Sequence, residues 1–110
     1  MSKSDYIVVL ITTNGVEEAQ LITRVLLEQR LAACVNIVPQ INSSYWWQGK
    51  IESGEESLLV AKTRAALLDT LVKSVREVHS NEVPEIIALP IVGGSQDYLD
   101  WIGRETSGCV

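Results

Sequence analysis

The hydrophobic positions in the first part of the chain follow two periods, which predict a strand and then a helix. Residues 6–12 form a continuous apolar run rich in β-branched side chains, which is typical of a buried strand. From about residue 16 to residue 30, apolar positions recur at helical spacing. Asn14, with Glu17 three residues later, predicts a capping box at the start of this helix. One helix face carries Ala19, Ile22, Leu26 and Ala33, with Val25 beside them.

The middle of the chain predicts two extended segments on either side of a hairpin. Residues 31–42 are strand-like, and Pro39 marks an edge or a bulge because proline cannot donate a hydrogen bond to a β-ladder. The acidic run at 52–56 is expected to be a solvated loop rather than a cation site. Residues 57–62 then return as the third strand.

The remaining pattern predicts a second helix, a fourth strand and a short last helix. Thr63 is expected to cap a helix over about 64–78, whose apolar positions recur at i, i+3, i+4 and i+7. A strand over 85–92 follows, and Ser95 is expected to cap the last helix. The order β-α-β-β-α-β plus a C-terminal helix predicts an α+β, ferredoxin-like fold in one domain spanning 1–110.

Three consecutive aromatic residues, Tyr45, Trp46 and Trp47, lie directly before the expected turn at 48–50. Successive side chains on a strand point to opposite faces, so the two indoles would lie on opposite faces of the hairpin. The sheet face that the two helices do not cover also remains apolar. Both features predict a homo-oligomer with these aromatic residues as interface anchors, and ligand stacking is the alternative role for the indoles.

The charge balance narrows the range of partners. Nine basic residues against 14 acidic ones give a formal net charge of −5, which argues against a nucleic-acid partner. We interpret the charge as favouring solubility, with attraction of cations as the alternative. No apolar run approaches the roughly 20 residues that span a bilayer, so no membrane partner is expected.

The start of the chain and its cysteines predict a reduced, cytoplasmic compartment. Residues 1–4 lead straight into the first strand and do not resemble a secretory signal. Cys34 and Cys109 are too few for a disulfide framework. Cys109, the second-last residue of the sequence, is expected to be mobile and to be oxidised or bind metal only adventitiously.

Four residues are candidates for a metal site. His79, the single histidine, falls at the end of the second helix, where it is either a capping or surface residue or a metal ligand. Glu82 and Glu85 follow in a turn and either supply oxygen ligands or lie in solvent. Cys34 lies in an apolar strand, as a small buried hydrophobic residue or as a thiolate near a subunit cleft. One histidine cannot build a multi-histidine site, so a site needs carboxylates, a thiolate or groups from adjacent subunits.

A second candidate site lies where the third strand meets the second helix. Lys62 and Arg64 flank Thr63 at this junction. The two cations either pair with the acidic surface or, with the following helix N-terminus, form a pocket for a small anion.

Several separate motifs occur in a fixed order along the chain. They read LAACVN (31–36), YWWQGK (45–50), KTR (62–64), EVPEII (82–87), ALP (88–90) and YLDW (98–101). Over residues 5–103 the chain thereby resembles the CutA family of divalent-cation tolerance proteins. The resemblance implies a ferredoxin-like homotrimer whose neighbouring subunits join strands at their edges. It also implies tolerance of copper and other divalent metals with Cu(II) binding, and an architecture similar to that of nitrogen-regulatory signalling trimers.

The chain departs from the family pattern at two places. The family loop His-Pro-Tyr-Glu here reads His79-Ser80-Asn81-Glu82, so interactions made by the family tyrosine are lost. Some relatives carry a cysteine in the first strand, whereas residues 9–12 contain none, which removes a soft ligand for Cu(I).

The leading hypothesis is a divalent-metal binding protein linked to copper tolerance, with no obligatory cofactor and with Cu(II) or another divalent metal as ligand. His79 and Glu85 are its first predicted ligands, followed by Glu82 and Cys34. The alternative is a trimeric signalling module that binds a small ligand between subunits near 62–64. A third possibility is a structural trimer whose metal effects are indirect. An enzyme is not expected, because the chain lacks a Ser-His-Asp set, a paired-carboxylate motif, a phosphate loop and a dinucleotide fingerprint.

Overall fold

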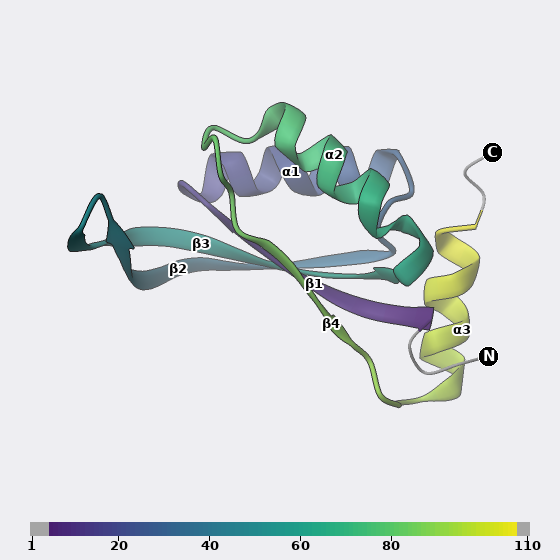
Figure 1. Ribbon diagram of the computed structural model, residues 1–110. Coiled ribbons are helices and arrows are strands. Elements are labelled where there is room, and N and C mark those ends of the chain that lie inside the picture. The colour runs from purple at the N-terminus through teal and green to yellow at the C-terminus, as the bar shows by residue number, and fades with distance from the viewer. Residues whose placement is uncertain (1–4, 108–110) are drawn as a thin grey trace.

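The computed structural model describes residues 5–107, which form four strands and three α-helices in the predicted order (Figure 1). Cys109 lies outside the described residues. The elements are β1 (Tyr6–Thr13), α1 (Val16–Glu28), β2 (Cys34–Trp47), β3 (Lys50–Arg64), a 3₁₀ turn (Ala65–Leu67), α2 (Leu68–Val78), β4 (Ile86–Pro90) and α3 (Gln96–Glu105). The predicted α+β class and element order are therefore confirmed. Within the described residues, no helix is long and apolar enough to cross a membrane.

The four strands form one sheet in the order β2-β3-β1-β4, and every neighbouring pair is antiparallel. At the centre of the sheet, Val9 lies opposite Ala61 on one side and Ala88 on the other. β2 and β4 are the two edge strands. The register of β2 against β3 shifts between Val38 and Ile41, so Pro39 lies at an irregularity in an edge strand, as predicted.

The two sheet faces differ in how they are covered. α1 and α2 lie together over one face (Figure 1). The core beneath them contains Ile7, Val9, Ile11, Ala19, Ile22, Leu26, Leu59, Ala61, Leu71 and Val75. On the opposite face, Ile87 and Leu89 of β4 are each about half exposed. α3 lies at the end of the sheet away from the hairpin tip, so the described residues leave most of this apolar face uncovered (Figure 1).

The hairpin extends further than the sequence predicts, because the acidic run is strand and not loop. β3 begins at Lys50 and pairs with β2 through the whole of 52–56. The turn consists of Gln48 and Gly49, whose φ angles are 51° and 79°. Positive φ at both residues is what a two-residue turn needs in order to match the twist of the two strands. β1 pairs with β3 only over residues 57–64. The part of the hairpin between Ser57 and the turn therefore projects as a ribbon of two strands, β2 and β3.

The predicted helix caps are the least accurate part of the sequence analysis. Gly15, with φ of 116°, occupies the N-cap of α1, and no side chain caps this helix. Thr63 is a fully buried residue of β3, and the 3₁₀ turn separates it from α2. Ser95 occupies the predicted N-cap position of α3 but makes no side-chain capping hydrogen bond. Strand pairing and turn geometry set these boundaries more strongly than local capping preference.

Candidate metal and ligand sites

A group of polar side chains forms where β2, β3 and α3 meet. Cys34 lies directly opposite Lys62 in the β2–β3 register. The Lys62 Nζ lies 3.9 Å from the Cys34 Sγ and donates a hydrogen bond to the Asn36 Oδ1. Tyr98 of α3 is hydrogen-bonded to the Cys34 side chain, and its ring lies 5.5 Å from that of Trp101. We call Cys34, Asn36, Lys62 and Tyr98 the polar cluster.

The electrostatics of the polar cluster favour an anion or a neutral polar group over a metal cation. Burial raises the pKa of Tyr98 above its ordinary value, and the charge and hydrogen bond of Cys34 raise it further. Tyr98 therefore keeps its proton and remains a donor at neutral pH. The Lys62 ammonium repels a cation that approaches the thiol. Cys34 is half-buried among these groups instead of packing as a small buried hydrophobic residue.

The structure does not bring Lys62, Thr63 and Arg64 together in one pocket. Side chains alternate along β3, so Lys62 and Arg64 lie on one sheet face and Thr63 lies on the other, beneath the helices. The Thr63 hydroxyl is buried and has no hydrogen-bond partner among the described residues. Arg64 donates to the Oγ1 (3.0 Å) and the carbonyl oxygen (2.8 Å) of Thr106, at the end of α3. Only Lys62 therefore contributes to the polar cluster.

His79 lies at the C-cap of α2 with its side chain fully buried. The Nε2 atom lies 2.8 Å from the carbonyl oxygen of Thr12. The Nδ1 atom accepts a hydrogen bond of 3.0 Å from the backbone N–H of Asn81. Both ring nitrogens thus have partners in the same chain, one at the end of β1 and one in the loop after α2.

Glu18 connects the start of α1 to this loop, and the sequence analysis did not identify it. One carboxylate oxygen accepts the backbone N–H of Asn14 and the other accepts that of Ser80, both at 2.9 Å. The Asn14 amide nitrogen donates to the Ser80 hydroxyl and to the Asn81 amide oxygen, both at 2.8 Å. The sequence does place acidic residues in the first turn of this helix, which could have pointed to Glu18. With Asn14 taken as the cap, however, the capping-box spacing selects Glu17.

The environment of Glu18 favours its charged form. Burial alone would raise the pKa of this carboxyl, but the hydrogen bonds from Asn14 and Ser80 outweigh burial and lower the pKa below its ordinary value. The His79 Nε2 lies 3.8 Å from the nearer carboxylate oxygen, which is an ion pair only when the imidazole is protonated. We call Asn14, Glu18, His79, Ser80 and Asn81 the loop latch.

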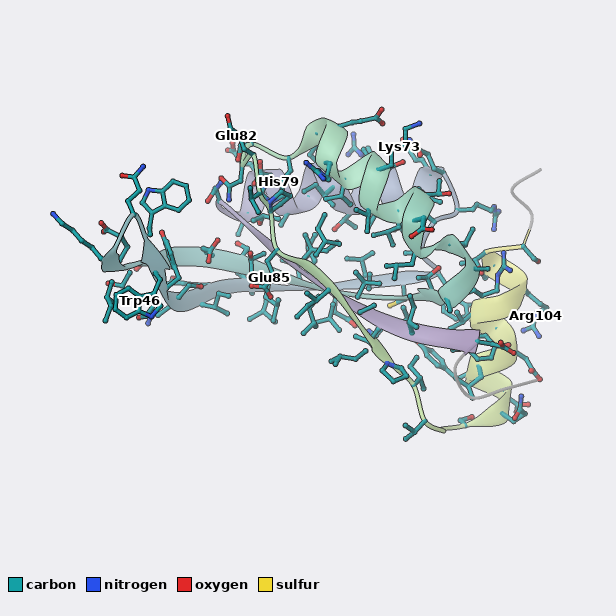
Figure 2. All side chains as sticks on the ribbon, in the orientation of Figure 1. Trp46, Lys73, His79, Glu82, Glu85 and Arg104 are labelled. Carbon is teal, nitrogen blue, oxygen red and sulfur yellow. The ribbon has the colours of Figure 1, made fainter. Side chains whose placement is uncertain are left out.

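The predicted metal ligands do not form a cluster within one chain. Glu82 and Glu85 are exposed, at the top of the α2–β4 loop and just before β4, whereas His79 lies beneath the end of α2 (Figure 2). Cys34 belongs to the polar cluster at the start of β2. Across residues 5–107, no three or more His, Cys, Asp or Glu side chains are arranged to hold a metal ion.

The aromatic residues lie on the hairpin, with Trp46 near its tip (Figure 2). Trp46 is 73% exposed and Trp47 is 58% exposed. Their cross-strand neighbours are Ile51, itself 67% exposed, and Lys50. The prediction of a projecting hairpin that its own chain leaves uncovered is confirmed.

Comparison with known proteins identifies relatives over almost the whole chain. A family profile described as CutA1 divalent ion tolerance protein matches residues 7–105. A Thermus thermophilus protein named divalent-cation tolerance protein CutA is 48% identical over 101 residues, which cover 92% of this chain and 97% of the relative. The solved structure of a CutA1 protein from Thermus thermophilus superimposes with a TM-score of 0.91 at 46% identity, covering 93% of this chain and 99% of that one.

Some relatives are longer than this chain. The rice protein named Protein CutA 1, chloroplastic, is 47% identical over 100 residues, which are 91% of this chain but only 56% of the relative. The chain therefore spans about half the length of this relative.

Proposed function

The chain belongs to the CutA1 family of divalent ion tolerance proteins, and we propose that it binds divalent metal ions as a homotrimer and acts in metal tolerance. The observation that carries this proposal is the 48% identity to a relative named divalent-cation tolerance protein, over 97% of that relative's length. Cu(II) is the first metal to test. The proposed role is binding without catalysis, in the cytoplasm.

Residues 5–107 of a single chain do not provide a complete metal site, so the proposed site takes donors from more than one copy. Among the predicted ligands, Glu82 and Glu85 have exposed carboxylates that a metal ion can reach from solvent. His79 and Cys34 instead interact with other side chains or backbone groups of the same chain. Carboxylate oxygens bind divalent ions well, but two carboxylates from one chain are too few to hold such an ion tightly. We therefore place the site at a subunit boundary, where carboxylates from neighbouring chains come together.

Three features of the single chain support the homotrimer. Trp46 and Trp47 are exposed at the hairpin, the sheet face with Ile87 and Leu89 is uncovered, and the edge strands β2 and β4 are unpaired on one side. Exposed aromatic anchors, apolar patches and open strand edges are the surfaces that copies of one chain cover by association. A hairpin that reaches a neighbouring subunit would cover all three at once.

Metal titration with simultaneous mass measurement tests this proposal. We expect Cu(II) and Zn(II) to bind the trimer in a whole-number ratio with submicromolar affinity in calorimetry, while light scattering reports the mass. Glu85→Gln should weaken binding by at least about tenfold, because even the loss of a residue that only orients a metal ligand costs this much. Glu77→Gln on the exposed side of α2 is the matched control and should bind as the unaltered protein does. Weak, non-stoichiometric binding would contradict the metal proposal and favour a structural trimer.

The polar cluster supports a second candidate function, the binding of a small anionic or polar ligand in a signalling trimer. An ammonium, an amide and a hydroxyl converge there, at Lys62, Asn36 and Tyr98. Thermal-shift screening with nucleotides and organic acids should give a rise in melting temperature that Lys62→Met abolishes. Lys73→Met, on the exposed face of α2, is the matched control. No shift with any of these ligands would count against this candidate.

A further inference from the structure

We infer that His79 is a positioning residue that holds the loop between α2 and β4 in place, rather than a ligand of the metal. The inference rests on the proposed metal-binding function, because that loop carries Glu82 and Glu85. It follows from the protonation state that the partners of His79 require.

The two hydrogen bonds of His79 fix its tautomer. A backbone N–H can only donate, so the N–H of Asn81 requires a lone pair on Nδ1. A backbone carbonyl can only accept, so the oxygen of Thr12 requires a hydrogen on Nε2. His79 is therefore the neutral imidazole with its hydrogen on Nε2.

This tautomer leaves no ring nitrogen for a metal. A neutral imidazole binds a metal through its one unprotonated nitrogen. In His79 this nitrogen is Nδ1, which the Asn81 N–H occupies in a fully buried side chain. Coordination would break the part-buried hydrogen bond from the Asn81 N–H to the Nδ1 atom, which is costly.

The same bonds place His79 between fixed and exposed parts of the molecule. Through Thr12 the ring is attached to the end of β1, and through Asn81 it holds the residue directly before Glu82. Glu18 holds the adjacent Ser80 N–H from the start of α1. Both anchors lie in rigid elements, so together they restrict where the Glu82 carboxylate can lie.

Nitrogen-15 spectra of the imidazole, recorded on the full chain before and after saturation with Zn(II), test this inference. We expect one protonated and one unprotonated ring nitrogen, with hydrogen on Nε2, and no change in the Nδ1 resonance when Zn(II) binds. A Zn(II)-dependent displacement of the Nδ1 resonance, or hydrogen on Nδ1, would overturn the inference.

Two substitutions of His79 separate its two bonds. Asparagine can place an oxygen near the position of Nδ1, whereas glutamine can place an amide nitrogen near that of Nε2. Hydrogen exchange of the Asn81 amide should accelerate by about tenfold or more in His79→Gln and by clearly less in His79→Asn. Equal acceleration in both variants would contradict a specific role for Nδ1.

Zn(II) affinity supplies the decisive contrast between positioning and ligation. Glu18→Gln loosens the same loop and leaves the imidazole in place, so it should weaken Zn(II) binding by a small factor similar to that of His79→Gln. Near-complete loss of binding in His79→Gln alone would show that the ring is a ligand. If no Zn(II) binds at all, the proposed function fails separately, and the tautomer and the Asn81 exchange rate still decide the inference.

Discussion

The hairpin tip and the loop after α2 differ in where the partners of their side chains come from. At the tip, Trp46 is 73% exposed and its own chain leaves the ring uncovered. In the loop latch, each hydrogen bond of His79 ends on a group of the same chain. The hairpin thus leaves its aromatic side chains to be covered by the proposed trimer, whereas the hydrogen bonds of the latch are complete within one chain. Substitutions in the two regions should therefore affect different equilibria.

The largest effect is expected from Trp46→Ala at the hairpin. Removing an aromatic anchor that an interface buries typically costs roughly 2 kcal/mol or more of association free energy, so the proposed trimer should dissociate to monomers or aggregate. Light scattering over a dilution series measures this change. Glu52→Gln lies on the same ribbon, opposite Tyr45, and serves as the control that should leave the trimer intact. A Trp46→Ala protein that stayed a fully stable trimer would show that the hairpin is not the anchor.

A smaller effect, on folding instead of assembly, is expected from His79→Ala. The substitution leaves the Thr12 carbonyl and the Asn81 N–H without their partners, which should cost about 1–3 kcal/mol of the free energy of unfolding. Urea denaturation measures the loss, and the trimer mass should not change. Thr70→Ala, at an exposed position of α2, is the control and should stay within about 0.5 kcal/mol of the unaltered protein. Dissociation of the trimer in His79→Ala would remove the distinction between the two regions.

The smallest effect is expected from Glu18→Gln, and it should depend on pH. The pKa of Glu18 is lowered in the folded chain, so its charge stabilises the protein above the ordinary value of 4.5. This contribution is lost as the pH falls through the lowered folded-state pKa. Glu18→Gln should therefore reduce stability by about 0.5–1 kcal/mol at pH 7, and the difference should shrink on acidification. Urea denaturation at several pH values measures it, and a pH-independent difference would contradict a role for the charge.

The order of elements was predictable because each segment satisfies its own periodicity. The apolar run of β1 and the helical repeat of α1 are local patterns, and both elements lie where the patterns place them. The acidic run at 52–56 was mistaken for a loop because its composition is polar. A ribbon that is exposed on both faces can carry polar side chains along its strands. The tight turn at Gln48 and Gly49 brings β2 and β3 together from Lys50 onward, so the acidic run pairs with β2 as strand.

The candidate sites were less predictable than the fold, because they depend on which side chains meet. The sequence grouped Lys62 with Thr63 and Arg64, but strand alternation separates Thr63 from the other two. Lys62 instead meets Cys34, which is 28 residues away in the chain and lies opposite it in the sheet. Glu18 was not identified, because its partner Ser80 is 62 residues away.

The residue pattern alone was sufficient for the α+β class, the element order, the uncovered apolar sheet face and the projecting aromatic hairpin. These properties follow from the spacing and the hydrophobicity of residues that are close together in the sequence, so they can be read without knowing the tertiary contacts. The tertiary structure alone decided the tautomer of His79, the loop latch and the polar cluster. Hydrogen bonds act over about 3 Å, so distant residues such as Glu18 and Ser80 acquire a shared role only after folding brings them together.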